Sequence, residues 1–323
     1  MPSFARPPRL QKASGEVRRV GFEFEFSGID VATAAEAVAR VFGGSPYAKS
    51  PARWQVESPR GDFKIEIDWQ FLQQLAADQG EHANAEAWLD SLSQAASYVV
   101  PIEVVSPPLA MDALEPLSEL INALRDAGAQ GTDESFIAAY GTHINPELPD
   151  HEPTTILHYM QAYALLQWWL VRAHDVDKTR RVSPYIDLYP ENYVRQLVAY
   201  DEVTLEQLID DYLAANPTRN RALDMLPLFA ELDAERVRAQ LDDNKIKARP
   251  TLHYRLPNCR INETDWSLQT DWQIWCQVEQ LASRPKALQE LAQAFQAADR
   301  PVLGVARQPW ITKVDTWLNE NLG

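Results

Sequence analysis

Strict alternation in the stretch RVGFEFEFS constrains this chain more than any other feature. Phe22, Phe24 and Phe26 point to one side of an extended chain, and Glu23 and Glu25 point to the other. A period of two is the period of a β-strand, whereas a helix would distribute these residues around its axis. The stretch therefore predicts a strand with one apolar face for a core and one acidic face.

Similar alternation in five later segments predicts further strands of the same sheet. They are 52–57, 62–69, 101–105, 140–145 and 251–256. The polar side chains opposite their apolar faces and that of the first strand are Glu23, Glu25, Lys64, Glu66, Asp68, Glu103, His143, Asn145, His253 and Arg255. Antiparallel sheets often keep one face wet. An ordinary solvated face is thus the alternative explanation for any one of these strands.

Helical patterns fill the intervals between the predicted strands. They cover 31–42, 112–127, 154–174, much of 191–240, and two helices in the remainder of the chain. Strands scattered among helices predict an α+β fold, in which helices cover one face of an antiparallel sheet. The predicted organisation is a flexible N-terminal arm over 1–15, a catalytic α+β domain over 16–265 with a helical insertion at about 183–247, and a C-terminal helical segment over 266–323 packed on that domain.

Charge and cysteine content limit the expected partners. The formal net charge is -16, and binding to a nucleic-acid backbone needs clustered Lys and Arg, so nucleic acid is not expected. Two cysteines are too few for a disulfide framework. The N-terminal residues lack the apolar core of a signal peptide, and no stretch approaches the ~20 apolar residues of a membrane span. We expect a cytoplasmic protein that does not contact membranes.

The acidic face of the predicted sheet suggests a metal site. Glu23 and Glu25 lie two residues apart, so their Cα atoms are about 7 Å apart and their charges repel. A divalent cation neutralises such a pair. Mg²⁺ prefers hard oxygen ligands, whereas zinc favours His and Cys clusters. The predicted metal triad is Glu23, Glu25 and Glu103, with Glu66 and Asp68 as candidates for a second ion.

Basic side chains on the same face fit phosphate chemistry. Arg255 can bind phosphate oxygens through its planar fork, and phosphoryl transfer depends mainly on positioning and charge neutralisation. The sequence contains neither a P-loop nor a dinucleotide-binding glycine motif, so ATP would have to bind on the sheet. The predicted catalytic residues are Arg255, His143 and Glu103, and the predicted cofactor-binding residues are Lys64, Asn145, His253 and Arg255.

Four motifs, taken in order, resemble the signature blocks of the amidoligase family. They are GFEFEF at 21–26, EVVSPPL at 103–109, GTHINP at 141–146 and TLHYRLPN at 251–258. That family is similar to glutamine synthetase and glutamate–cysteine ligase. The resemblance implies a curved, glutamine-synthetase-like antiparallel sheet with ATP and metal in its concave face. It also implies that a carboxylate is phosphorylated and that an amine then displaces the phosphate.

The same resemblance carries over to individual positions. The matches are Glu23 and Glu25 for the acidic pair of the first strand, Glu103 for the Glu that opens the SPP block, His143 for the histidine near nucleotide and substrate, and Arg255 for the late-strand arginine. The chain departs from the family pattern at His253, where Glu is common. A second metal would then be held by Glu66 or Asp68.

The leading hypothesis is a ligase that uses ATP and Mg²⁺ to join a small-molecule or peptide carboxylate to an amine. A phosphotransferase of the guanidino-kinase type is one alternative, because the same sheet face would serve it. A non-catalytic nucleotide-binding protein of the same fold is another, because His253 departs from the family pattern. The sequence leaves the two substrates and the oligomeric state open.

Overall fold

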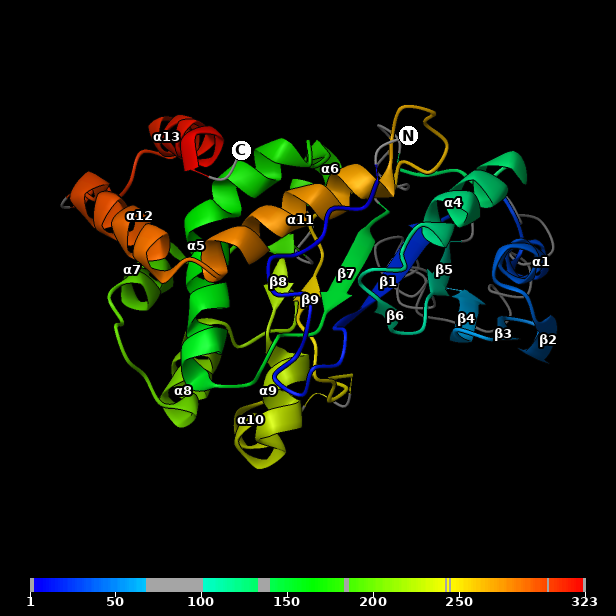
Figure 1. Ribbon diagram of the computed structural model, residues 1–323, viewed down its shortest axis with the longest axis horizontal. Helices are drawn as coiled ribbons and strands as arrows, with labels where there is room; N and C mark the ends of the chain where they lie inside the picture. The colour runs from blue at the N-terminus through cyan, green and yellow to red at the C-terminus, as the bar shows by residue number, and fades with distance from the viewer. Residues whose placement is uncertain are drawn as a thin grey trace, which may run out of the picture.

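The computed structural model describes residues 3–67, 101–132, 140–182, 186–241, 243, 245–300 and 302–321. Within these ranges an open, antiparallel sheet of nine strands has the order β2-β3-β4-β5-β1-β7-β9-β8, and β6 pairs with the start of β1 (Figure 1). The strands are β1 (Arg19–Phe26), β2 (Ser45–Ser50), β3 (Arg53–Ser58), β4 (Gly61–Ile67), β5 (Ile102–Val105), β6 (Leu109–Ala110), β7 (Thr142–Pro146), β8 (Leu223–Asp224) and β9 (His253–Tyr254). The predicted α+β class is confirmed.

Strand β1 has the predicted alternation and lies near the middle of the sheet. Phe22, Phe24 and Phe26 are completely buried. The Phe22 ring packs edge-on against Trp272, with ring centroids 6.1 Å apart. Further along the sheet, Tyr254 of β9 packs against Trp275, with centroids 4.8 Å apart. One face of the sheet is therefore the core.

Four helices form this core with the sheet: α1 (Val31–Phe42), α4 (Pro116–Asp126), α5 (Pro153–Ala173) and α11 (Leu268–Ala282). Helix α1 begins where the sequence predicts, because the side chain of Asp30 accepts a hydrogen bond from the backbone of Thr33 at 2.7 Å. Its small apolar residues, such as Ala34 and Val38, are buried. The described part of the chain holds no helix both long and apolar enough to cross a membrane.

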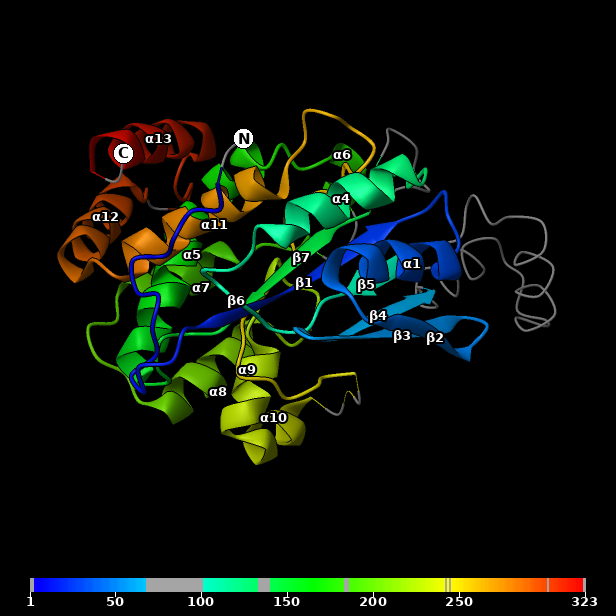
Figure 2. The same cartoon turned by 45° about the vertical axis from the view of Figure 1, so that its right-hand side comes forward.

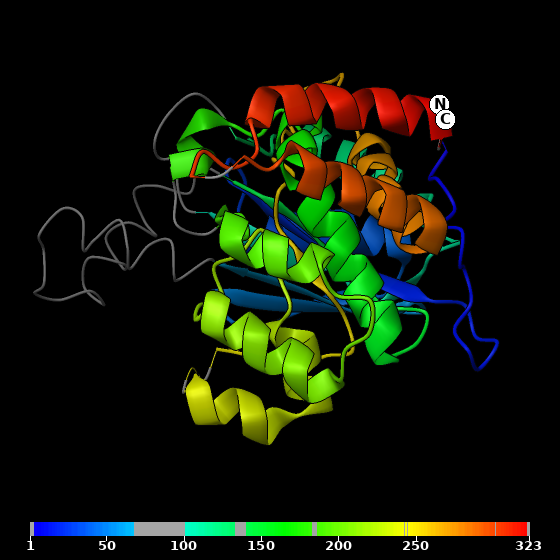
Figure 3. The same ribbon diagram turned by 90° about the vertical axis from the view of Figure 1, so that its left-hand side faces the viewer.

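The long connection between β7 and β9 is mostly helical. The helices between β7 and β9 are α5, α6 (Lys178–Val182), α7 (Glu191–Val198), α8 (Leu205–Ala215), α9 (Leu226–Leu232) and α10 (Ala234–Gln240). Figures 2 and 3 show α9 and α10 on one side of the sheet and α11 on the other. The polar face is therefore partly covered by α9 and the chain that follows α10.

Several predicted element boundaries are wrong. Strand β2 is an exposed polar edge strand without alternation, and β6 and β8 have two residues each, so periodicity did not reveal them. The last predicted strand is shortened to β9 because Pro250 and Pro257 flank it and cannot donate to a ladder. The C-terminal part has three helices instead of two, α11, α12 (Pro285–Ala298) and α13 (Arg307–Asn321), because Pro285 begins a new helix.

The predicted flexible N-terminal arm lies against the body of the protein over its described residues. Phe4 is buried in the core. The indole nitrogen of Trp272 donates a hydrogen bond to the carbonyl of Ala5 at 2.7 Å. Arg9 pairs with Asp150 at 2.7 Å. Pro7 and Pro8, which have fixed φ angles, favour the extended course of this segment along α11.

A buried ion pair joins the beginning of β1 to α11. Arg18 and Glu279 both have completely buried side chains, with Nη2 of Arg18 2.8 Å from Oε1 of Glu279. The guanidinium also donates to the carbonyls of Arg9 and Glu147, and Tyr159 donates to Glu279. The pair therefore holds together the N-terminal segment, the end of β7, α5 and α11.

Replacing Glu279 by Ala should lower the free energy of unfolding by about 3–5 kcal/mol, because Arg18 would remain buried without its counter-charge. Urea denaturation followed by circular dichroism measures this change. Glu290 is exposed on α12, and Glu290→Ala is the matched control that should leave the midpoint nearly unchanged. A similar small effect of both substitutions would contradict the assigned role of the pair.

Candidate active site

A cavity of about 590 Å³ lies on the polar face of the sheet. Its floor comes from β4, β5, β1, β7, β9 and β8, and its wall comes from the region of α9 and residues 245–249. The lining residues are Glu23, Glu25, Lys64, Glu66, Glu103, Val105, His143, Arg219, Asp224, Pro227, Lys245, Ile246, Lys247, Arg249, His253 and Arg255. Eight of the ten predicted site residues line it. Of the other two, Asn145 contacts Glu23 directly, and Asp68 lies outside the described residues.

Strand register places three carboxylates in a row across the floor. Glu66 of β4 lies opposite Glu103 of β5, and Glu103 lies opposite Glu25 of β1. Like charges directly opposite on neighbouring strands repel. Glu66 is partly neutralised by Arg53, whose Nε lies 2.7 Å from its carboxylate. A cation among Glu25 and Glu103 would remove most of the remaining repulsion.

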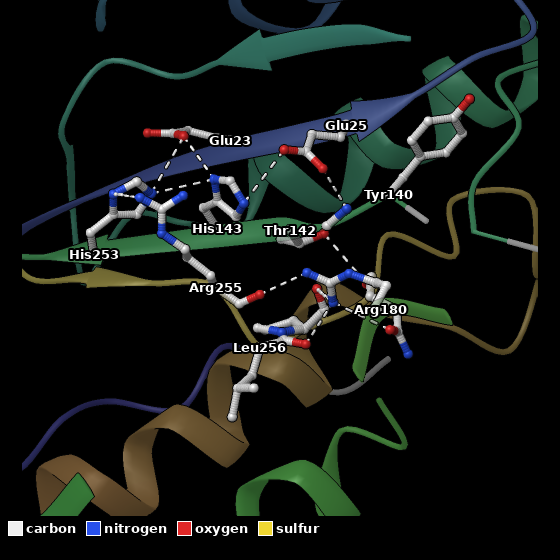
Figure 4. Close-up of polar contacts among 12 residues, drawn as sticks. Glu23, Glu25, Tyr140, Thr142, His143, Arg180, His253, Arg255 and Leu256 are labelled. Carbon is white, nitrogen blue, oxygen red and sulfur yellow. Dashed lines mark hydrogen bonds and ion pairs between the residues drawn. The ribbon is translucent and has the colours of Figure 1, made fainter. Parts of the chain in front are cut away.

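Glu23 accepts hydrogen bonds from several side chains, among them His143 (Figure 4). It lies opposite His143 of β7, and its Oε2 is 2.9 Å from Nδ1 of that ring. Its Oε1 accepts from Nδ2 of Asn145 at 2.8 Å and from Arg249 at 3.4 Å. Burial by itself would raise the pKa of Glu23, but His253, His143 and Arg249 together hold it well below its ordinary value.

His253 lies between Glu23 and Arg255. Its Nε2 is 3.7 Å from Oε2 of Glu23, and Nη2 of Arg255 donates to its Nδ1 at 3.2 Å. Burial, reinforced by the charge of Arg255, lowers the pKa of His253 well below its ordinary value. The ring is therefore neutral near pH 7. The groups that keep Glu23 ionised at that pH are then His143 and Arg249.

Arg255 has a second partner that the sequence did not indicate. Nη2 of Arg255 lies 3.2 Å from Oδ2 of Asp224, which β8 places beside His253. Burial raises the pKa of Asp224, although Arg255 opposes that shift. The sequence did not predict Asp224 because helical patterns flank it on both sides. A strand of two residues is also too short to show an alternation of apolar and polar side chains.

A basic wall faces the acidic floor, and Arg255 is its only residue among the predicted site residues. It consists of Arg219, Lys245, Lys247 and Arg249, together with Arg255 from the sheet. One signal was available in the sequence. Lys245, Lys247 and Arg249 alternate with Ile246 and Ala248, and such a cationic cluster is unusual in a chain with a net charge of -16.

Buried Arg180 supports the end of β9 from below the cavity (Figure 4). Its guanidinium donates to three consecutive carbonyls, those of Arg255, Leu256 and Pro257, at 2.7–2.8 Å. These carbonyls leave the sheet directly after β9, so they need other donors. Arg180 thereby holds the backbone that carries Arg255. Nothing local in the sequence marks it.

Among the described residues, two groups of side chains bring potential metal ligands within 4.8 Å of one another. One comprises Glu23, His143 and His253, and the other comprises Glu25, Glu103 and His143. The predicted triad of Glu23, Glu25 and Glu103 is thus divided between them. Both groups contain a histidine in addition to carboxylates.

The part of the chain that forms the cavity also matches a known protein family. A family model described as "Putative amidoligase enzyme" matches residues 16–277. The matched part runs from just before β1 into α11, and it includes every described residue of the cavity. A search of the curated proteins finds no match.

The two cysteines should not react in the native protein. Burial raises the pKa of Cys259 to about 12 and also raises that of Cys276, and both are free and buried. Neither thiol of the folded protein should react with a disulfide reagent such as DTNB at pH 8, whereas both should react when urea unfolds the protein. Rapid labelling of Cys259 in the folded protein would contradict its burial.

Proposed function

The chain belongs to the putative amidoligase family, and we propose that it is an ATP- and Mg²⁺-dependent ligase that joins a carboxylate to an amine through an acyl phosphate. Family membership supports an enzyme that forms amide bonds. The nucleotide, the metal and the intermediate are inferred from the cavity. A glutamine-synthetase-like sheet and a reducing, cytoplasmic location, consistent with two free cysteines, belong to the same proposal.

One observation carries the proposal: a carboxylate floor and a cationic wall face each other in a single cavity. Carboxylates alone would repel a triphosphate, and cations alone would not hold a divalent metal ion. Mg²⁺ between the floor and a nucleotide phosphate satisfies both, since this ion binds through a few carboxylates and substrate phosphates. We propose that the floor, including Glu23 and Glu66, provides the negative field for the ion, and the role of Asp68 at a second ion stays a prediction from the sequence.

The proposed reaction has two steps. An oxygen of the substrate carboxylate attacks the terminal phosphorus of ATP, and ADP leaves with the bonding electron pair. The amine nitrogen then attacks the acyl carbon, phosphate leaves, and the nitrogen loses a proton. Bound metal would neutralise charge on the transferring phosphoryl group.

The residues of this chain have distinct tasks in that scheme. Arg255 can bind phosphate oxygens in a bidentate manner, and Asp224 and Arg180 hold its side chain and backbone. Lys245, Lys247 and Arg249 enclose the phosphates from the wall, and Lys64 does so from the floor. Asn145 and Arg249 hold the carboxylate of Glu23. The carboxylate substrate would be a small molecule or a peptide.

A second candidate function is nucleotide binding without turnover. The observation that favours it is the contact of Arg255 with both His253 and Asp224, since an arginine held within the protein is less free to follow a transferring phosphoryl group. This alternative predicts ATP binding with no ADP release for any pair of carboxylate and amine.

Calorimetric titration of ATP should show binding that depends on Mg²⁺. The double variant Glu23→Ala, Glu25→Ala should lose that dependence, because it removes two of the floor carboxylates. Glu36→Ala, Glu119→Ala changes two exposed glutamates on α1 and α4 and is the matched control. Metal-independent binding of equal strength in all three proteins would exclude the acidic floor as the metal site.

Arg255→Ala should reduce ADP release by about 10²–10³-fold, the effect of removing one positioned donor to a developing charge. A coupled assay with a panel of carboxylates and amines measures this rate. Arg238 is exposed on α10, and Arg238→Ala should keep the wild-type rate. Full turnover by Arg255→Ala would remove Arg255 from the mechanism.

A further inference from the structure

His143 belongs to both candidate metal groups, and its two ring nitrogens face different carboxylates. Nδ1 lies 2.9 Å from Oε2 of Glu23, and Nε2 lies 3.5 Å from Oε1 of Glu25 (Figure 4). A neutral imidazole carries its proton on one nitrogen and a lone pair on the other. The position of that proton therefore decides which of the two groups can bind an ion through His143.

Hydrogen bonding places the proton of His143 on Nδ1. At 2.9 Å, the contact with Glu23 is a normal hydrogen bond, and an ionised carboxylate can only accept. The 3.5 Å between Nε2 and Glu25 is longer than a normal hydrogen bond. Nε2 therefore presents a lone pair toward Glu25. His143 is 8% exposed and lines the cavity.

The tautomer of His253 excludes the other group. Arg255 has only donors, so Nδ1 of His253 must accept its hydrogen bond. Since Nδ1 accepts, the proton of His253 is on Nε2, 3.7 Å from Oε2 of Glu23. Its 3.4 Å separation from Nδ1 of His143 then joins two N–H groups and is not a hydrogen bond. Nε2 of His253 has no lone pair for a metal. Glu23 also accepts hydrogen bonds from Asn145 and Arg249 on its other oxygen.

We propose that the metal ion binds to Glu25, Glu103 and Nε2 of His143, and that Glu23 is a positioning residue that orients the His143 ring. A ligating histidine commonly donates its second ring N–H to a carboxylate, which sets its tautomer. The second nitrogen of His143 makes this contact with Glu23. This assignment refines the site of the proposed ligase. The catalytic role of the metal ion rests on that proposed function, whereas metal binding itself can be measured without it.

The ligand set also defines the ions that the site prefers. Two carboxylates suit Mg²⁺ and Mn²⁺, while an imidazole nitrogen favours first-row transition metals over Mg²⁺. The site should therefore bind Mn²⁺ more tightly than Mg²⁺. Replacing His143 by Gln should weaken Mn²⁺ binding more than Mg²⁺ binding, because only the transition metal gains from the nitrogen.

Pulsed electron paramagnetic resonance of the nucleotide-free protein with Mn²⁺ tests the ligands directly. The wild type should show nitrogen modulation from one coordinated imidazole. His143→Gln should lose it, whereas His253→Gln should keep it. Glu23→Ala should weaken Mn²⁺ binding about 10–100-fold while the ion retains its carboxylate ligands. Circular dichroism confirms that each variant is folded.

Three outcomes would overturn the assignment. Loss of nitrogen modulation in His253→Gln, or two coordinated nitrogens in the wild type, would favour Glu23, His143 and His253 as the ligands. No nitrogen modulation in the wild type would exclude His143 as a metal ligand. The resonance measurement contains no ATP, so its result does not depend on the ligase function. A nitrogen signal from a protein that shows no turnover in the ADP-release assay would therefore count against the ligase function and leave the metal assignment intact.

Discussion

Burial of one face of β1 is the constraint on which the rest of this structure depends. Phe22, Phe24 and Phe26 enter the core, and the period of a strand then leaves Glu23 and Glu25 no position except the opposite face. Each neighbouring strand adds its own polar residues there through its register. An acidic floor is thus a direct consequence of how the core is formed.

That floor needs positive charge, and the fold provides it from two directions. The residues after α10 contribute Lys245, Lys247 and Arg249, and β9 contributes Arg255. None of these residues is close to β1 in sequence, so the balance of charge depends on the complete tertiary structure. The buried pair of Arg18 and Glu279 contributes by holding β1 against α11, which keeps the floor in place.

The amount that sequence reasoning could predict varies between the elements. Strands β1, β4 and β7 have alternation long enough to identify, and five of the polar residues assigned to their open faces line the cavity: Glu23, Glu25, Lys64, Glu66 and His143. Strand β8 has two residues, and two residues have no period, so Asp224 could not be assigned. Arg180 was missed for a different reason. It donates to the carbonyl of Arg255, which is 75 residues later in the chain, and no local pattern indicates such a contact.

The sequence by itself determined which residue types share the polar face, because side-chain direction along a strand follows from local backbone geometry alone. It also determined the family, through four short motifs in order. Only the tertiary structure decided how those residues divide into groups. Register sets Glu25 beside Glu103 and Glu23 beside His143, and the contact of Arg255 with His253 sets a tautomer. Hydrogen bonds over such separations depend on distances of a few tenths of an ångström, which spacing along a chain does not specify.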